Sequence, residues 1–364
     1  MQTNSVKLLK YDNLLNKLDH KSIREQADDD TFSTIATFYG YNVEYTDADD
    51  CDLVVFDLYR CHHYFHFHPV MLVPDCNWQV ISSRNIPIVF WHSGECWPVA
   101  KSEFLIFAKD HTNCRIWYVD SNLNTETQEH LFFNSAETLN FLSMGNKGLK
   151  HNYNYVEHLP YDYKFSTVTG RGDLHKNIIC NLISTELAGK SHFTDPQSLP
   201  YANTFTGLDN LCKTPDADPW LDYSEILNLR NRSMITVSLG TYFINTQEDW
   251  LNFEPCYITE KGFEESANNN PVMPVSHAGT IKYFRSLGIE FPDWIDFSYD
   301  DIADDNSRMH AVIAELHRLN TLDNLTELAL DYKINCNNNR IIEKLSFKKD
   351  FEDILDKIIP HDLS

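Results

Sequence analysis

The sequence lacks any long apolar run and any closely spaced cysteine pair. No stretch approaches the roughly 20 apolar residues that a membrane-spanning helix requires, and charged residues from Lys7 to Lys21 interrupt the N-terminal segment. We therefore expect neither a membrane span nor a signal peptide. The nine cysteines are scattered without a C-x-x-C pair. This odd number predicts reduced thiols in a cytoplasmic protein, and it argues against a disulfide framework or a cysteine-rich zinc site.

Glycine, proline and basic residues are also scarce. Only 12 glycines and 14 prolines occur in 364 residues, whereas 13% of the residues are aromatic. This composition excludes collagen-like, low-complexity and disordered classes. Basic residues number 30 against 53 acidic ones, so the formal charge is -23. The mean field repels nucleic acid and anionic lipid, and any contact with nucleic acid would need a local basic cleft.

Short apolar runs alternate with helical stretches in both halves of the chain. This pattern is typical of an α/β fold around a largely parallel sheet. The predicted strands cover residues 52–58, 86–92, 104–108, 115–119, 165–169, 234–239 and 271–275. The last of these is the weakest, because prolines remove hydrogen-bond donors from a sheet.

The irregular stretch at 144–164 predicts an interdomain connection with a boundary near residue 160. We therefore expect domains at 1–160 and 161–330, followed by a C-terminal helical segment at 331–364. Apolar residues at helical spacing predict buried helix faces in the last part of the chain. They are Met309, Val312, Ile313 and Leu316, then Leu322, Leu325 and Leu328, then Phe351, Ile354, Leu355, Ile358 and Ile359.

A group of aspartates precedes the first of these helices. Asp300, Asp301, Asp304 and Asp305 lie where carboxylates favour the positive end of a helix dipole. Capping and solvation are the favoured interpretation. A metal cluster is the alternative.

The segment from Cys256 to Gly288 carries the strongest chemical signal. Its Thr-Glu-Lys is followed by a predicted helix, a strand, and a second helix that opens at Gly279. A helix start offers N–H groups to a phosphate, Lys261 adds a positive charge, and Glu260 can accept from ribose hydroxyls. The alternative is a surface helix with solvated Glu260 and Lys261.

The run Tyr257-Ile-Thr-Glu-Lys261 resembles the Tyr-Val-Thr-Glu-Lys signature of the α-1,3-fucosyltransferases. The resemblance implies that Tyr257 lies beside the donor base, Glu260 binds ribose and Lys261 meets the diphosphate. The wider run 271–288, with Ser-Tyr-Asp-Asp-Ile at 298–302, is similar to glycosyltransferase-like proteins of bacteriophages. A phage-encoded chain would act in the host cytoplasm.

A second, partial resemblance to the same family lies in the first half. In the run SGECWPVAKSEFLIFAKD, Gly94, Glu95 and Pro98 match the family order, while Cys96 replaces an asparagine. The resemblance implies that Glu95 is the general base for the acceptor hydroxyl. His92 and Ser93 depart from the family pattern, and His92 is a separate candidate for the acceptor site. A helix cap or a surface carboxylate is the alternative for Glu95.

Two further groups have candidate roles in binding. Arg171 and His175 follow the strand at 165–169, and the family pattern, which has an arginine near this helix start, implies phosphate contact by one of them. In the run CHHYFHFH at 61–68, alternate residues share a face if the run is a strand. An acceptor groove that includes Tyr64 is favoured there over a His-ligated metal site.

These features predict two Rossmann-like domains that face a cleft, the GT-B architecture, with C-terminal helices. The expected activity is inverting transfer of a sugar from a GDP- or UDP-sugar to a hydroxyl of a glycan. No tightly bound cofactor and no metal are expected. The alternatives are a glycosyltransferase that modifies hydroxymethylated phage DNA, and a catalytically inactive nucleotide-sugar or interaction protein. A His-ligated metalloenzyme is the least favoured interpretation.

Overall fold

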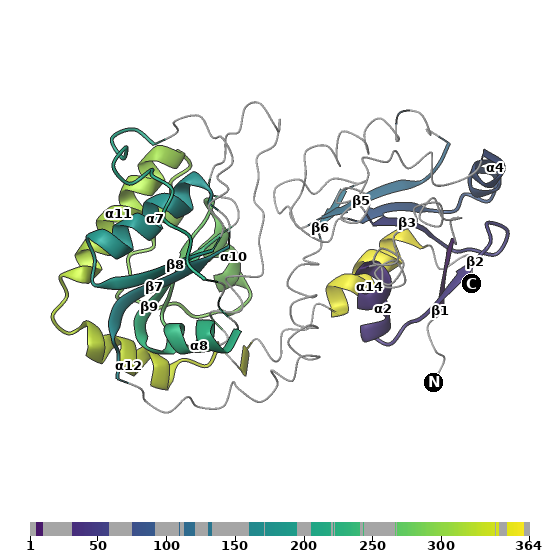
Figure 1. Ribbon diagram of the computed structural model, residues 1–364. Coiled ribbons are helices and arrows are strands. Elements are labelled where there is room, and N and C mark those ends of the chain that lie inside the picture. Colours follow the sequence, from purple (N-terminus) through teal and green to yellow (C-terminus); the bar gives the residue numbers. More distant parts are fainter. Residues whose placement is uncertain are drawn as a thin grey trace. The chain divides into compact units, whose positions relative to one another are not determined.

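The computed structural model divides into two compact units (Figure 1). The first contains residues 1–146 together with 346–364, and the second contains residues 147–345. The residues whose structure is described are 5–9, 31–57, 75–91, 109, 113–120, 130–132, 160–170, 172–194, 205–219, 221, 223–240, 243, 266, 268–338, 340–341 and 348–359. Each unit is built on parallel strands, so the predicted α/β class is confirmed.

The first unit carries short parallel strands with two helices between them in the sequence. The strands are β1 (Ser5–Leu9), β2 (Asn42–Thr46), β3 (Val54–Asp57), β4 (Ile88–Trp91), β5 (Ile116–Asp120) and β6 (His130–Phe132). The helices are α2 (Thr31–Phe38) and α4 (Asp75–Ser83). β1 pairs with β2, and a second sheet has the order β3-β4-β5-β6. An isolated parallel bridge between Leu8 and Leu53 links β1 to the residue before β3. β4 is buried along its whole length, as expected for a strand inside a parallel sheet.

A helix near the C-terminus, α14 (Lys348–Ile358), completes the core of the first unit. Phe351 is fully buried, and its ring centroid lies 5.6 Å from those of both Phe32 and Tyr39. The rings of Tyr41 and Trp91 lie 5.8 and 6.0 Å away. These contacts explain why residues 346–364 belong to the first unit, although the sequence suggested a separate helical segment at 331–364.

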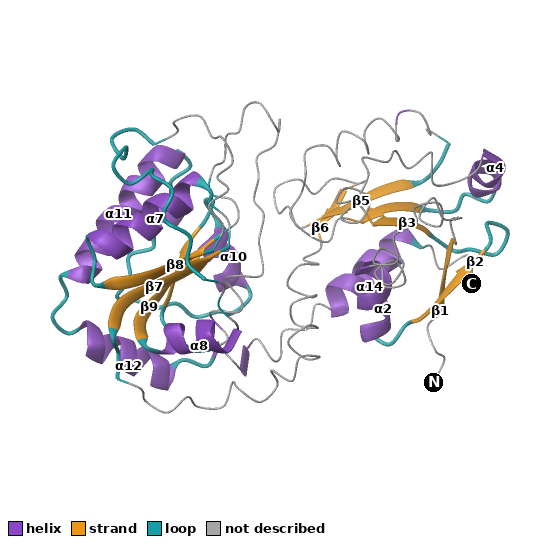
Figure 2. Ribbon diagram, in the orientation of Figure 1, coloured by secondary structure: helices purple, strands orange, loops and turns teal. Residues whose placement is uncertain are grey.

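The second unit contains a four-stranded parallel sheet with the order β10-β9-β7-β8 (Figure 2). The strands are β7 (Tyr163–Thr169), β8 (Gly189–Phe193), β9 (Ser233–Leu239) and β10 (Val272–Val275). The helices are α7 (Leu174–Thr185), α8 (Tyr223–Asn231), α10 (Thr280–Ser286), α11 (Asp305–Asn320) and α12 (Leu325–Asn335), with a 3-10 helix η4 at Ser298–Asp301. α7 contacts β7 and β8, while α8 and α12 contact β9.

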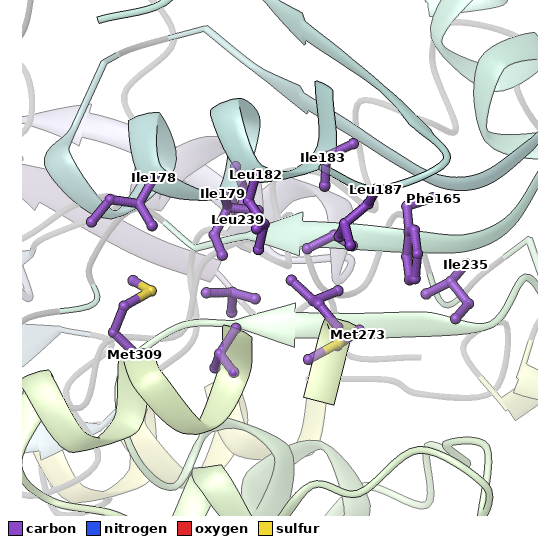
Figure 3. Close-up of a cluster of buried hydrophobic side chains, with 14 of the residues drawn as sticks. Phe165, Ile178, Ile179, Leu182, Ile183, Leu187, Ile235, Leu239, Met273 and Met309 are labelled. Atoms are coloured by element: carbon purple, nitrogen blue, oxygen red, sulfur yellow. The ribbon is translucent and has the colours of Figure 1, made fainter. Parts of the chain in front are cut away.

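The core of the second unit lies between this sheet and its helices (Figure 3). Its members from β7, β9, β10 and α11 lie in strands and a helix face that the sequence predicted, whereas the members from α7 and the turn after it were not predicted. The core includes Phe165, Ile178, Ile179, Leu182, Ile183, Leu187, Ile235, Leu239, Met273 and Met309. Met309, Val312 and Leu316 of α11 are all fully buried, which confirms the predicted face of that helix.

Six of the seven predicted strands fall on described residues, and each coincides with a strand within a few residues at either end. The prediction at 104–108 lies outside the described part of the chain. The sequence analysis missed β1, β2, β6 and β8. Among the described residues, no helix is long and apolar enough to cross a membrane.

Phe351→Ala should lower the free energy of unfolding by about 3–5 kcal/mol, because it empties a fully buried aromatic site. Denaturant unfolding followed by near-UV circular dichroism measures this loss. Asp353→Ala, at an exposed position of the same helix, is the control and should stay within about 0.5 kcal/mol of the parent. Equal effects of the two substitutions would show that α14 does not complete this core.

Candidate functional site

The carboxyl ends of the strands in the second unit define the candidate site. Because β10, β9, β7 and β8 are all parallel, they end at the same edge of the sheet. Thr169, Phe193, Leu239 and Val275 are their last residues. Open parallel α/β sheets bind their ligands at this edge. The polar residues that follow these strands are therefore the candidates for ligand binding.

One of the eight predicted site residues, His175, is described. The other seven lie outside the described residues. They are Tyr64, His92, Glu95, Arg171, Tyr257, Glu260 and Lys261.

The structure places His175 in the first turn of α7, where a hydrogen bond links its side chain to the residue directly after β9. Its side chain is 3% exposed, and its Nε2 lies 3.0 Å from the carbonyl oxygen of Gly240. A carbonyl oxygen can only accept, so Nε2 carries the hydrogen in this contact. The ring also stacks on Phe243, with centroids 5.4 Å apart. His175 thus ties α7 to the chain that leaves β9.

A buried ion pair lies at the start of the same helix. Asp173 is the N-cap residue of α7, but its side chain makes no capping hydrogen bond. Instead its carboxylate accepts from the Lys176 ammonium at 2.5 Å, and both side chains are almost completely buried. Lys176 is therefore neutralised by Asp173. Asp173 therefore does not cap the first-turn N–H groups of α7, as an aspartate at this position often does.

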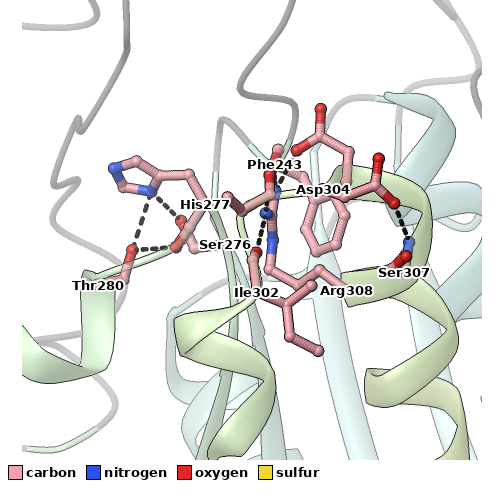
Figure 4. Close-up of polar contacts among 10 residues, drawn as sticks. Phe243, Ser276, His277, Thr280, Ile302, Asp304, Ser307 and Arg308 are labelled. Atoms are coloured by element: carbon pink, nitrogen blue, oxygen red, sulfur yellow. Dashed lines mark hydrogen bonds and ion pairs between the residues drawn. The ribbon is translucent and has the colours of Figure 1, made fainter.

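The turn after β10 carries a histidine held by two hydroxyl groups (Figure 4). Nδ1 of His277 lies 3.0 Å from Ser276 Oγ and 2.8 Å from Thr280 Oγ1. The Thr280 hydroxyl donates to the carbonyl oxygen of His277 at 2.9 Å, so it can only accept from Nδ1. This assigns a hydrogen to Nδ1. Nε2 of the neutral ring is then an acceptor.

The ends of β9 and β10 approach each other closely because residue 240 is a glycine. A Cβ atom at Gly240 would lie 2.5 Å from Ser276 Oγ and 2.8 Å from Ser276 Cβ. The N–H of Gly240 donates to the carbonyl oxygen of Val275 at 2.9 Å. No side chain fits between the two strands at this point. The residues that directly follow β9 and β10 therefore lie side by side.

The start of α10 is occupied by a side chain of the protein itself. Gly279, with φ of 86°, is the N-cap residue, as the sequence predicted for the start of this helix. The carboxylate of Asp300 accepts from the N–H groups of Ile281 at 3.1 Å and Lys282 at 3.0 Å. These two N–H groups are therefore satisfied by Asp300. The helix start expected beside Glu260 and Lys261 lies outside the described residues. Burial raises the pKa of Asp300, while the two amide hydrogen bonds oppose that shift.

The Ser-Tyr-Asp-Asp-Ile run at 298–302 thus has a structural role at this edge. Next to Asp300, Tyr299 is buried, and its hydroxyl donates to the carbonyl oxygen of Pro274 in β10 at 2.7 Å. Burial raises the pKa of Tyr299 well above its ordinary value. Both residues hold the turn between β10 and α10 in place.

Asp304 confirms the capping interpretation for one residue of the acidic group. Asp304 is the N-cap of α11 and accepts from the N–H of Ser307 at 2.8 Å, which lowers the pKa of its carboxyl. Asp305 forms an ion pair with Arg308. Among the described residues, no group of three or more His, Cys, Asp or Glu side chains could hold a metal ion.

Two residues of this edge were missed by the sequence analysis. Arg308 is fully buried and donates to the carbonyl oxygen of Phe243 (Figure 4). Its guanidinium also lies 4.5 Å from the centroid of the Phe243 ring. No sequence signal points to this pair, because the two residues are distant in the chain and neither belongs to a motif. The glycine directly after the apolar run of β9 is a sequence signal for the close approach of two strands.

Comparison with solved structures shows the same fold in known proteins. The structure matches an α1,3-fucosyltransferase with a TM-score of 0.52 and 10% sequence identity, covering 99% of this chain and 91% of that one. The likeness confirms the predicted GT-B fold, with its two Rossmann-like units, and agrees with the family that the sequence motifs resemble.

Two matches to phage enzymes have lower scores. One is a mutant of the T4 phage enzyme BGT in complex with UDP-glucose, with a TM-score of 0.42, 11% identity, and coverage of 98% of this chain and 99% of that one. The other is the DNA-modifying enzyme β-glucosyltransferase, with a TM-score of 0.42, 12% identity and the same coverage. No family model and no curated protein sequence matches this chain.

Gly240→Ala should destabilise the second unit by about 1–3 kcal/mol, because the new methyl group overlaps Ser276. Thermal unfolding measures the change. Gly170→Ala is the matched control, since among the described residues its Cβ would meet only Thr194 Oγ1, at an ordinary 3.7 Å. Adding Ser276→Gly to Gly240→Ala should restore part of the loss. No difference between Gly240→Ala and Gly170→Ala would contradict the close approach of the two strands.

Proposed function

We propose that the chain is a glycosyltransferase that moves a sugar from a nucleotide diphosphate sugar to a hydroxyl acceptor. The observation that carries the proposal is the Tyr257–Lys261 motif in a chain with the fold of an α1,3-fucosyltransferase. The motif is a sequence resemblance, so its support for nucleotide binding does not depend on the likeness of the fold. Low overall identity leaves the donor sugar open, with GDP- and UDP-sugars as the candidates.

The carboxyl edge of the second unit supports donor binding there. His175, the Asp173–Lys176 pair and His277 all lie where nucleotides bind in parallel α/β sheets. In this proposal Tyr257 lies beside the base, Glu260 binds the ribose hydroxyls, and Lys261 with Arg171 meets the diphosphate. A cation at the diphosphate stabilises the negative charge that develops on the leaving group.

The proposed reaction is a direct displacement at the anomeric carbon. The acceptor oxygen forms the new glycosidic bond while the bond from the anomeric carbon to the diphosphate oxygen breaks. The acceptor proton goes to the Glu95 carboxylate, and the nucleoside diphosphate leaves with the bonding electron pair. Such a displacement inverts the anomeric centre. A base is required because a sugar hydroxyl is a poor nucleophile at neutral pH.

A glycan is the proposed acceptor, with His92 and Tyr64 in the acceptor site. The charge of -23 supports it over a polyanionic acceptor. The resemblance of residues 271–302 to phage proteins favours a second candidate, hydroxymethylated bases of phage DNA. Transfer to DNA should fall steeply as salt rises from 50 to about 200 mM, whereas transfer to a neutral glycan should change little. Parallel assays at the two salt concentrations separate these acceptors.

Nucleotide binding is the first test of the proposal. A matching nucleoside diphosphate at about a hundredfold above its Kd should stabilise the chain by about 2.7 kcal/mol. A thermal-shift screen of GDP, UDP, ADP, CDP and their sugars measures this. Lys261→Ala should remove most of the shift, while Lys190→Ala, an exposed lysine on β8, should keep it. If none of these nucleotides shifts the parent, donor binding and the proposed function fail together.

Glu95→Gln tests the catalytic step separately. Removing the base should lower the transfer rate by about 10²–10⁴-fold, while the nucleotide-induced thermal shift stays at the parent value. Glu44→Gln, at an exposed position of β2, is the control and should retain full transfer. Unchanged transfer by Glu95→Gln would reject Glu95 as the base. A parent that binds nucleotide sugars but transfers to no acceptor would be a binding protein with this fold.

A further inference from the structure

The chain that leaves β9 is held at two carbonyl oxygens by side chains from two helices. His175 of α7 donates to Gly240 at 3.0 Å. Arg308 of α11 donates to the carbonyl oxygen of Phe243, as Figure 4 shows. Gly240 also keeps its own hydrogen bond to Val275 of β10. The backbone is therefore held in place at both residue 240 and residue 243 by these hydrogen bonds.

The same two side chains also contact the ring of Phe243. This ring is 1% exposed. The guanidinium carbon of Arg308 lies 4.5 Å from its centroid, and the imidazole of His175 stacks on it with an interplanar angle of 19°. A cation over an aromatic face and a stacked ring both favour one orientation of the phenyl group. Phe243 is thus fixed through its backbone and its side chain together.

Burying the charged side chain of Arg308 costs desolvation free energy. Its contacts show which groups it holds in place. It is fully buried and pairs with Asp305. Besides Phe243, it donates to the carbonyl oxygens of Ile302 at 2.7 Å and Ala303 at 3.2 Å. Well-packed apolar residues often stabilise a fold as well as a buried ion pair does. An apolar side chain, however, cannot fix three carbonyl oxygens in one geometry. Arg308 joins the start of α11 to the chain beyond β9 in that way.

We infer that Arg308 and His175 are positioning residues for the nucleotide-sugar donor, an inference that rests on the proposed function. They fix the exit of β9, a central strand of the sheet, at the edge where a nucleotide binds. Arg308 acts through Phe243 and does not contact the donor. The Nε2 hydrogen of His175 is used by Gly240, so His175 acts through the backbone in the same way.

Arg308→Met is the main test, because methionine fills similar space without the donors. Hydrogen exchange of peptides covering residues 240–243 should become at least about tenfold faster in the ligand-free variant. The Kd of the nucleotide found in the thermal-shift screen, measured well below the unfolding temperature, should rise on the order of tenfold to a hundredfold. Arg308→Lys, which keeps the charge but has no planar fork, should recover only part of both effects.

Arg318→Met is the matched control on the same helix. Arg318 also pairs with a carboxylate three residues earlier, Glu315, and donates to a backbone carbonyl oxygen, that of Trp294 at 2.6 Å. Its contacts are away from the residues that follow β9. Arg318→Met should leave the Kd within about twofold and the exchange of 240–243 unchanged, whatever it does to stability.

The outcomes separate this inference from the proposed function. Unchanged exchange at 240–243 in Arg308→Met overturns the inference, and so does faster exchange with an unchanged Kd. A parent that binds no nucleotide overturns both the inference and the proposed function. If Arg308→Met does not fold, Phe243→Leu replaces it, because leucine keeps the carbonyl oxygen and an apolar side chain but removes the ring. The same two measurements, with the same expected directions, then decide.

Discussion

The parallel pairing of β9 with β7 on one side and β10 on the other is the constraint on which the candidate site depends. Phe165 pairs with Ile235, and Val275 pairs with Leu239, so the strands run in one direction and end together. Residues that are far apart in the sequence therefore meet at one edge. A glycine directly beyond β9 removes the side chain that would separate its exit from that of β10.

Four aspartates among the described residues near this edge have local partners. Asp300 accepts from two backbone N–H groups, and Asp304 caps a helix. Asp173 and Asp305 are paired with Lys176 and Arg308. Each of these carboxylates is therefore compensated locally by an amide or a cation. The net charge of -23 is therefore not concentrated in these four side chains.

The sequence predicted elements marked by a continuous apolar run or by an apolar stripe at helical spacing, and it missed strands in which polar and apolar residues are mixed. Apolar runs located β3, β4, β7 and β9, and helical stripes located α11 and α14. β8 has the sequence Gly-Lys-Ser-His-Phe, and its last three residues are buried. It was missed because two of these three buried residues are polar, so the sequence shows no apolar run. His175 was singled out as a candidate for phosphate contact, and that role stays a prediction. The structure shows it buried, with Nε2 bonded to the carbonyl oxygen of Gly240. Arg308 and Phe243 were not singled out, because only the folded chain brings their atoms together.

The return of α14 to the first unit has a consequence for biosynthesis. Residues 1–146 leave the ribosome long before Phe351, whose ring fills the space among Phe32, Tyr39 and Trp91. The second unit, by contrast, is contiguous in sequence and can close as soon as residue 345 has emerged. During translation the rings that contact Phe351 therefore lack this partner until the chain is almost finished. Apolar surface that is exposed before folding is complete favours aggregation, so we expect the first unit to be the later of the two to become protected.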